Sequence, residues 1–405
     1  MKIALVAQHA MPLRPRAGSG PDSDDIGLSE LTRMLASRGH QVTVYAQKHQ
    51  PDLPDAAELH HGVRVEYIDS GAASACDKEG DAGLLERVPA FSVPLRSRFR
   101  RERPDVAHAL SWTSGLAALT AARDLGIPVV QEFSSLGVTE RRERTKRRGR
   151  VKANGADAAR IRLEPAIGRS AAAVVVTHSA DVSDLANLGV RRSSIRVVPW
   201  GVNTDTFTPE GPVAKRNGRP RLVTAADLTE RAALETLLRA LTRVPGAELL
   251  VVGGPDRAVL SQDKAYAGLA AFTGTLGLSD RVLFTGTMEH WLMPALLRSA
   301  DLVVSTCRYE PTGTTSLQAM ACGTPVLAPP VGGHADAVVD GTTGILMPAG
   351  RPALLAQRIR HLLAHPMLIE AYGVAAADRA RSRYSWDRIA GETLAVYDKA
   401  LAQAA

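Results

Sequence analysis

The fold of this 405-residue chain is decided by the stretch Y-E-P-T-G-T-T-S-L-Q-A-M-A-C-G-T-P, residues 309–325. Residues 301–306 before it are mostly apolar and predict a short strand, and residues 316–322 predict the opening of a buried helix. The loop between them is rich in Gly and Thr. Backbone N–H groups and the positive end of a helix dipole favour an anion at such a place. The stretch therefore predicts one strand–loop–helix unit of an α/β layer.

The same alternation continues on both sides of this unit. Gly27 and Gly115 open segments with helical periodicity, which end near residues 37 and 125. Apolar runs that predict strands occur at residues 3–7, 41–46, 106–109, 129–131, 173–177, 195–198, 221–225, 248–252, 282–285, 302–305, 325–328 and 344–347. Strands that alternate with helices indicate parallel sheets covered on both faces, so the fold class is α/β.

A polar segment rich in Pro and Gly, residues 208–220, divides this pattern into two series and predicts a linker. We therefore expect a Rossmann-like domain over residues 1–207 and a second over 221–380, facing each other across a cleft. Ligands of such sheets bind at the carboxyl ends of the strands.

Composition indicates a globular protein of a reducing compartment. The chain is 45% apolar, which suits two α/β cores. Cys76, Cys307 and Cys322 have neither metal-ligand nor C-x-x-C spacing, so no metal is expected. No apolar run has spanning length, and residues 1–7 are too short for a signal peptide. We expect a cytoplasmic protein without membrane association.

The net charge of +7 is concentrated in residues 96–103 and 141–152. The favoured interpretation is two solvated loops. A patch for a phosphorylated acceptor or an anionic membrane surface is the alternative. Aromatic residues are not interleaved with the basic ones, so no nucleic-acid partner is expected.

Residues 309–325 resemble the donor-site signature of the family-4 retaining glycosyltransferases, which have the GT-B fold. That signature reads Glu-Pro-Phe-Gly, a few small residues, then Glu-Ala-Met-Ala-Cys-Gly. Glu310 matches the first glutamate, and Gln318 stands in place of the second. Segments 104–118, 198–207 and 250–255 resemble actinobacterial members. The tail resembles the family's last helix, which implies that residues 381–405 pack back on the first domain.

This resemblance implies a role for each matching residue. Glu310 would be the catalytic carboxylate, and Gln318 would hold the ribose hydroxyls through its amide oxygen. The residues expected to bind the rest of the donor are Gly313, Thr314, Thr315, Ser316, Thr287, Met288 and Arg231.

The second domain departs from the family where the donor diphosphate is normally held by an Arg and a Lys. Asp227 and Ala232 occupy these two positions. A carboxylate near a diphosphate costs on the order of 4 kcal/mol per charge pair at an effective dielectric of about 20. Arg231, next to the lost lysine, is the candidate to compensate, although neighbouring residues of a helix point about 100° apart.

The first domain departs as well. Asp24 and Asp25 stand at the family's Gly-Gly positions, where acidic residues also simply favour a helix N-terminus. Ser134 replaces a His that reaches the donor sugar. Together with Trp112 these residues are expected on the first-domain side of the cleft.

Two functions remain open. The first is an enzyme of specialised metabolism that transfers a sugar, or a cyclitol as in a pseudo-glycosyltransferase, from a nucleotide-linked donor to a small-molecule acceptor. A variant of it places a divalent cation on Asp22, Asp24, Asp25 and Asp227. The second is a catalytically silent protein that binds a metabolite or pairs with an active glycosyltransferase; a homodimer is compatible with either.

Overall fold

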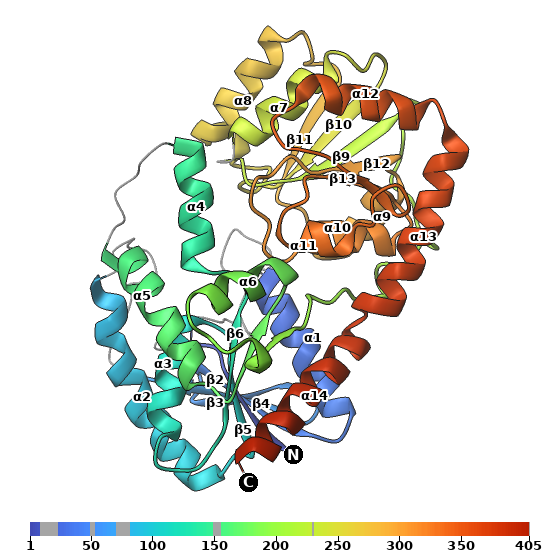
Figure 1. Ribbon diagram of the computed structural model, residues 1–405. Coiled ribbons are helices and arrows are strands. Elements are labelled where there is room, and N and C mark those ends of the chain that lie inside the picture. The colour runs from blue at the N-terminus through green and yellow to red at the C-terminus, as the bar shows by residue number, and fades with distance from the viewer. Residues whose placement is uncertain (9–22, 49–52, 70–81, 149–154, 229–230, 405) are drawn as a thin grey trace. The chain divides into compact units, whose positions relative to one another are not determined.

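A computed structural model describes residues 1–8, 23–48, 53–69, 82–148, 155–228 and 231–404. The chain forms two compact units (Figure 1). The first contains residues 23–199 and 387–404 together with the N-terminal strand, and the second contains residues 200–386. Each unit has its own sheet and its own apolar clusters, and each is described separately below.

The first unit is built on a sheet with the strand order β3-β4-β2-β1-β5-β6-β7-β8. All neighbouring strands are parallel except β3 and β4, which form an antiparallel hairpin. The strands are β1 (Lys2–Val6), β2 (Gln41–Gln47), β3 (Ala56–His60), β4 (Val63–Ile68), β5 (Val106–Ala109), β6 (Val129–Phe133), β7 (Ala173–Val176) and β8 (Ile195–Val197). The helices are α1 (Ser23–Ser37), α2 (Ala82–Glu102), α3 (Trp112–Ala122), α4 (Gly137–Arg148), α5 (Gly155–Ser170), α6 (Ser179–Asn187) and α14 (Trp386–Ala404).

The second unit is built on a parallel sheet with the order β11-β10-β9-β12-β13-β14. Its strands are β9 (Arg221–Ala225), β10 (Glu248–Val252), β11 (Val282–Gly286), β12 (Leu302–Val304), β13 (Val326–Ala328) and β14 (Gly344–Leu346). Its helices are α7 (Arg231–Leu241), α8 (Lys264–Thr275), α9 (Met293–Arg298), α10 (Thr314–Ala321), α11 (Gly332–Ala337), α12 (Pro352–Leu363) and α13 (Pro366–Tyr384).

Helices cover both faces of the second sheet, as the sequence predicts. One apolar cluster packs α7, α8 and α12 against the sheet, and another packs α9, α10 and α13 against it (Figure 1). A strand buried on both faces reads as a continuous apolar run. Residues 249–252 of β10 have this pattern and are all buried, and the buried Glu248 before them pairs with Arg221 at 2.6 Å. The carboxyl ends of these parallel strands therefore meet along one edge of the sheet.

The last helix, α14, belongs to the first unit although it is the end of the chain. Tyr397 of α14 is fully buried, and its hydroxyl lies 2.8 Å from Nδ1 of the buried His108 on β5. Arg38, just after α1, contacts both the backbone oxygen and the carboxylate of Asp387 at 2.8 Å. The expected return of the C-terminal helix to the first domain is confirmed.

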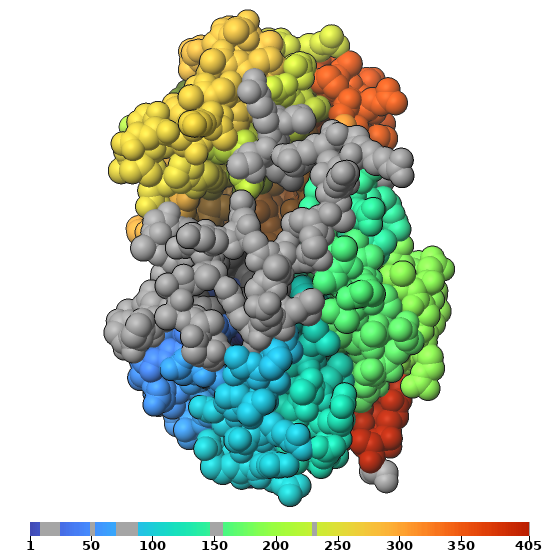
Figure 2. Space-filling model, turned by 90° about the vertical axis from the view of Figure 1, so that its left-hand side faces the viewer, coloured from blue at the N-terminus to red at the C-terminus, as the bar shows by residue number. Residues whose placement is uncertain are grey.

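The described parts of the two basic runs, residues 96–102 and 141–148, are helical rather than loops, which corrects the favoured sequence interpretation. Residues 96–102 end α2, which forms part of the surface of the first unit shown in Figure 2, and residues 141–148 end α4. Arg98 donates to the buried carboxylate of Glu66 at 2.9 Å, and Arg142 donates to the carboxylate of Asp184 at 3.1 Å. Part of this charge therefore pairs with acidic groups of the same unit. No helix of the described residues combines the length and apolarity needed to cross a bilayer.

Candidate functional site

The loop after β12 holds the carboxylate of Glu310 in a defined position. Its Oε1 accepts hydrogen bonds from the backbone N–H of Gly313 at 2.9 Å and from the hydroxyl of Thr312 at 3.4 Å. Gly313 is the N-cap of α10 and has φ +70°, a left-handed conformation that glycine adopts without steric cost. The carboxylate is therefore fixed at the start of α10.

A second loop, which follows β13 and continues into the first residues of α11, packs directly against the first. The backbone N–H of Gly333 donates to the carbonyl oxygen of Glu310 at 2.9 Å. A Cβ at Gly332 would lie 1.8 Å from the same oxygen, and a Cβ at Gly333 would lie 2.5 Å from the Thr312 backbone. Only glycine fits at these two positions, so the sequence Gly-Gly allows the two loops to touch.

His334 joins the two loops through its side chain. Its Nδ1 lies 2.9 Å from the hydroxyl of Ser316, and its Nε2 lies 3.1 Å from the Ser305 hydroxyl and 3.4 Å from Cys307 Sγ. Burial lowers the pKa of the His334 imidazole, and the Glu310 carboxylate offsets only part of that effect. The ring is therefore neutral near pH 7.

Sequence reasoning missed His334 and gave Cys307 no role. These side chains are 27 positions apart, and only the pairing of β12 with β13 brings them together. The available signal was a histidine directly after the Gly-Gly pair, at a strand-to-helix connection.

The other residues predicted around α10 lie in its first turns. Thr314 and Thr315 are half-buried, and the Thr314 hydroxyl is 2.9 Å from that of Thr312. Ser316 is buried against His334, so its hydroxyl is already engaged. Gln318 is half-buried one turn further along. The structure thus brings Glu310 and the predicted α10 residues into one cluster.

Thr287 and Met288 follow β11 on the same carboxyl edge of the sheet. The backbone N–H of Thr287 donates to the Pro255 carbonyl at 3.2 Å, and its hydroxyl contacts the carbonyl of Gly254. Met288 is partly buried against the apolar cluster of α9 and α10. Both residues are separated from the Glu310 loop by strands β10 and β9 in the sheet order.

The substituted clamp positions follow β9, the strand between β10 and β12. Asp227 is exposed, two residues beyond the end of this strand. Arg231 and Ala232 open α7, but their side chains lie outside the described part of the structure. The carboxyl edge of the second unit therefore carries Asp227 where the resemblance implies an arginine.

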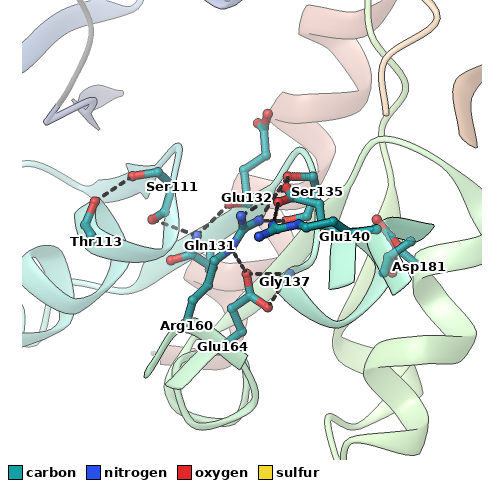
Figure 3. Close-up of polar contacts among 12 residues, drawn as sticks. Ser111, Thr113, Gln131, Glu132, Ser135, Gly137, Glu140, Arg160, Glu164 and Asp181 are labelled. Atoms are coloured by element: carbon teal, nitrogen blue, oxygen red, sulfur yellow. Dashed lines mark hydrogen bonds and ion pairs between the residues drawn. The ribbon is translucent and has the colours of Figure 1, made fainter. Parts of the chain in front are cut away.

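In the first unit, the loop after β6 is organised by a buried carboxylate and two half-buried charges (Figure 3). Glu164 accepts two hydrogen bonds from the Gly137 N–H, at 2.9 and 3.2 Å, and one from Arg160 Nε at 2.6 Å. Arg160 also donates to Glu140 at 3.0 Å and to the Ser135 carbonyl at 2.8 Å. Burial raises the pKa of Glu164, while the Arg160 charge opposes that shift. This network fixes the turn between β6 and α4.

The predicted first-unit residues lie near this turn or at helix starts. The Ser134 carbonyl accepts from the Thr177 hydroxyl at 3.2 Å. Trp112 is the half-buried first residue of α3. Asp24 and Asp25 are in the first turn of α1; Asp25 is half-buried, and the Asp24 side chain lies outside the described residues. Asp22, named for a cation, also lies outside them, so that variant stays a prediction.

Comparison with known proteins agrees with the two-unit architecture. Residues 27–201 match the family described as "Glycosyl transferase 4-like domain", and residues 219–365 match "Glycosyl transferases group 1". The chain is 31% identical to a D-inositol 3-phosphate glycosyltransferase of Frankia alni, over 98% of this chain and 99% of that protein. It is 28% identical to D-inositol 3-phosphate glycosyltransferase 2 of Catenulispora acidiphila, over 99% and 95%.

Solved structures give the same result. Sucrose-phosphate synthase from Thermosynechococcus elongatus superposes with a TM-score of 0.84 at 26% identity, with both chains fully covered. HepE of Anabaena, solved with UDP-glucose, superposes with a TM-score of 0.72 at 18% identity over 98% of this chain and 99% of that one, and shows the fold alone. The family matches, the near-complete overlap with actinobacterial relatives and the two Rossmann-like sheets together establish that this chain belongs to the GT-B glycosyltransferases with group 1 and 4-like domains.

Proposed function

We propose that this glycosyltransferase moves a sugar or cyclitol group from a nucleoside-diphosphate donor to a small hydroxylated acceptor in the cytoplasm. The observation that carries the proposal is the Glu310 carboxylate, fixed by the Gly313 N–H at 2.9 Å at the start of α10. A carboxylate held in this way is ready to accept hydrogen bonds from hydroxyls of the transferred ring.

The start of helix α10 beside Glu310 is placed to stabilise the departing diphosphate. Negative charge grows on the diphosphate as the glycosidic bond breaks, and the positive end of the α10 dipole stabilises charge of that sign. We infer a retaining reaction in which a phosphate oxygen of the donor takes the acceptor proton, because the proposal then needs no separate protein base.

The comparisons favour a uridine diphosphate donor and a polyol acceptor. HepE was solved with UDP-glucose, and the actinobacterial relatives are named for D-inositol 3-phosphate. A phosphorylated polyol would also be attracted to the basic helix α4, on which Arg141 is exposed.

A thermal-shift panel of UDP, GDP, ADP, dTDP and their sugars, with and without Mg²⁺, tests the donor. A ligand that binds only the folded protein at 100 times its Kd stabilises it by about 2.7 kcal/mol. We expect UDP and one UDP-sugar to raise the melting temperature and Glu310→Gln to weaken the sugar's extra contribution. If no nucleotide gives a shift, the proposed donor is wrong.

Asp227 favours a second candidate, the catalytically silent protein. An exposed carboxylate beyond β9 replaces a cation that would bind diphosphate. The double change Asp227→Arg with Ala232→Lys separates the candidates. If the natural chain is catalytically silent, the double variant gains nucleotide-sugar binding that the natural chain lacks. If the natural chain is an active transferase, its transfer activity is already measurable, and the double variant keeps it or loses part of it.

A further inference from the structure

Three side chains of metal-ligating type meet where the two loops of the second unit touch. Cys307 Sγ, a carboxylate oxygen of Glu310 and a ring nitrogen of His334 all lie within 4.8 Å of one another. Cys307 Sγ is 3.4 Å from His334 Nε2. Tetrahedral zinc, with bonds of about 2.3 Å to sulfur and about 2.05 Å to nitrogen, places these two atoms about 3.6 Å apart. The observed separation is close to what one shared ion requires.

The surrounding residues orient these groups as second-layer partners do in metal sites. When Nδ1–H of His334 donates to the Ser316 hydroxyl at 2.9 Å, the Nε2 lone pair faces Cys307 Sγ at 3.4 Å and the Ser305 hydroxyl at 3.1 Å. An ion bound at Nε2 replaces the contact with Ser305. The Gly313 N–H holds Glu310 through Oε1.

We propose that Cys307, Glu310 and His334 bind one divalent cation of the zinc class. Sulfur and imidazole donors favour Zn²⁺ and its neighbours over Mg²⁺, which prefers oxygen. Three protein ligands leave a fourth position for water or substrate, as in catalytic rather than structural zinc sites.

The place of the site suggests what the cation does, and this part rests on the proposed function. The cluster lies beside the first turn of α10, where the donor is proposed to bind. A divalent cation there supplies positive charge on an edge of the sheet where the family's arginine is replaced by Asp227. The bound ion therefore strengthens diphosphate binding.

Metal binding is measured first, on the full chain after treatment with a chelator that is then removed. We expect one Co²⁺ per chain with a sulfur-to-metal charge-transfer band, displaced by Zn²⁺ but not by Mg²⁺. Cys307→Ser abolishes the band. Cys307→Ser and His334→Asn each raise the Zn²⁺ Kd by more than the roughly 10–100-fold that losing a second-layer partner costs. Cys76→Ala and Cys322→Ala retain the three ligands and keep wild-type binding.

No stoichiometric binding, or equal binding by Cys307→Ser, His334→Asn and the wild type, overturns the site. Circular dichroism confirms that each variant is folded. UDP titrations with and without Zn²⁺ then test the role: the wild type binds UDP at least about tenfold more tightly with Zn²⁺, a difference of about 1.4 kcal/mol, and Cys307→Ser shows no difference. Zinc binding without any UDP binding contradicts the proposed function alone, and equal UDP binding in both conditions contradicts the role of the cation.

Discussion

Gly332 shows how closely single residues determine the donor-side loops. It has φ +49°, and a Cβ there would lie 1.8 Å from the Glu310 carbonyl oxygen. Gly341 also has a positive φ, +71°, but a Cβ there would meet nothing within 4 Å. A comparison of alanine variants at the two positions therefore separates the cost of backbone strain from the cost of disturbing the contact between the loops.

We predict that Gly332→Ala destabilises the protein more than Gly341→Ala does. Left-handed backbone costs a non-glycine residue about 1–2 kcal/mol at either position, and only Gly332→Ala adds the clash with the Glu310 loop. Urea unfolding gives the two stabilities, and UDP titration should show weaker binding for Gly332→Ala only. Equal losses of stability and unchanged binding in both variants would show that the loops are not in contact.

Asp181 in the first unit is a buried acid with a strongly shifted pKa. Burial, and then the charge of Asp184, raise the pKa of Asp181 to about 7. The Thr139 hydroxyl lies 3.4 Å from Asp181, Nε2 of His178 lies 3.2 Å from it, and Arg142 opposes the shift. The folded protein thus keeps this proton up to about pH 7, whereas the unfolded chain loses it above about pH 3.9.

We predict that Asp181 lowers stability as the pH rises from about 4 to about 7. The folded state binds more protons than the unfolded state in this range, so the contribution of Asp181 to the free energy of unfolding falls by up to about 1.4 kcal/mol per pH unit. Asp181→Asn should flatten the slope and raise the free energy of unfolding at pH 8, as measured by urea unfolding from pH 5 to 8. If Asp181→Asn is instead less stable at pH 8, Asp181 is ionised and paired with His178.

At the residue scale, sequence reasoning found only part of the candidate site. Glu310, Thr314 and Ser316 lie close together in the sequence, within a recognisable motif, and the structure places them together. His334 and Cys307 could not be paired from the sequence, because their contact depends on the register between two strands and on the absence of side chains at two glycines.

At the scale of elements, strands buried on both faces were the most predictable. The apolar runs of β5, β9 and β10 coincide with their predicted ranges. The hairpin of β3 and β4 was missed, because β3 is partly exposed and its sequence A-A-E-L-H has little apolar alternation. The basic runs were taken for loops because charge hides helical periodicity, although straight-chain Arg and Lys favour helices.

The attachment of α14 to the first sheet gives a prediction at this scale. Tyr397→Phe removes the hydroxyl that lies 2.8 Å from Nδ1 of His108 and leaves a buried ring nitrogen without that partner. We expect a loss of about 1–3 kcal/mol. In a double-mutant cycle with His108→Ala, measured by urea unfolding, the double variant should lose less than the sum of the single losses. Additive losses would mean that the two side chains do not interact.

For the whole molecule, two alternating series in the sequence predict two Rossmann-like sheets, and the structure has both. Each sheet has its own apolar clusters. The chain passes from the first unit to the second near residue 199 and returns near residue 387. Val202 donates to the Tyr384 carbonyl at 2.8 Å close to both passages.

We predict that deleting residues 387–405 damages the first unit and spares the second. The deletion exposes the surface that Tyr397 and Ala400 bury. Hydrogen exchange should show lost protection in β1 and β5 but not in β9 and β10, whereas deletion of residues 401–405, of which Ala402, Gln403 and Ala404 are exposed, should change neither. Unchanged protection of β1 and β5 in the longer deletion would contradict the role of α14.

The contact between His108 and Tyr397 also bears on the order in which the protein is made. The two residues are 289 positions apart. At a synthesis rate of about 5–20 residues per second, Tyr397 follows His108 by about 15–60 s. During that time the nascent first unit waits on the ribosome with its β5 surface uncovered, while the whole second unit emerges. The first unit, although it begins the chain, is thus the last to complete its fold. Chaperones that bind exposed apolar surface have the longest time to bind at its uncovered β5 surface.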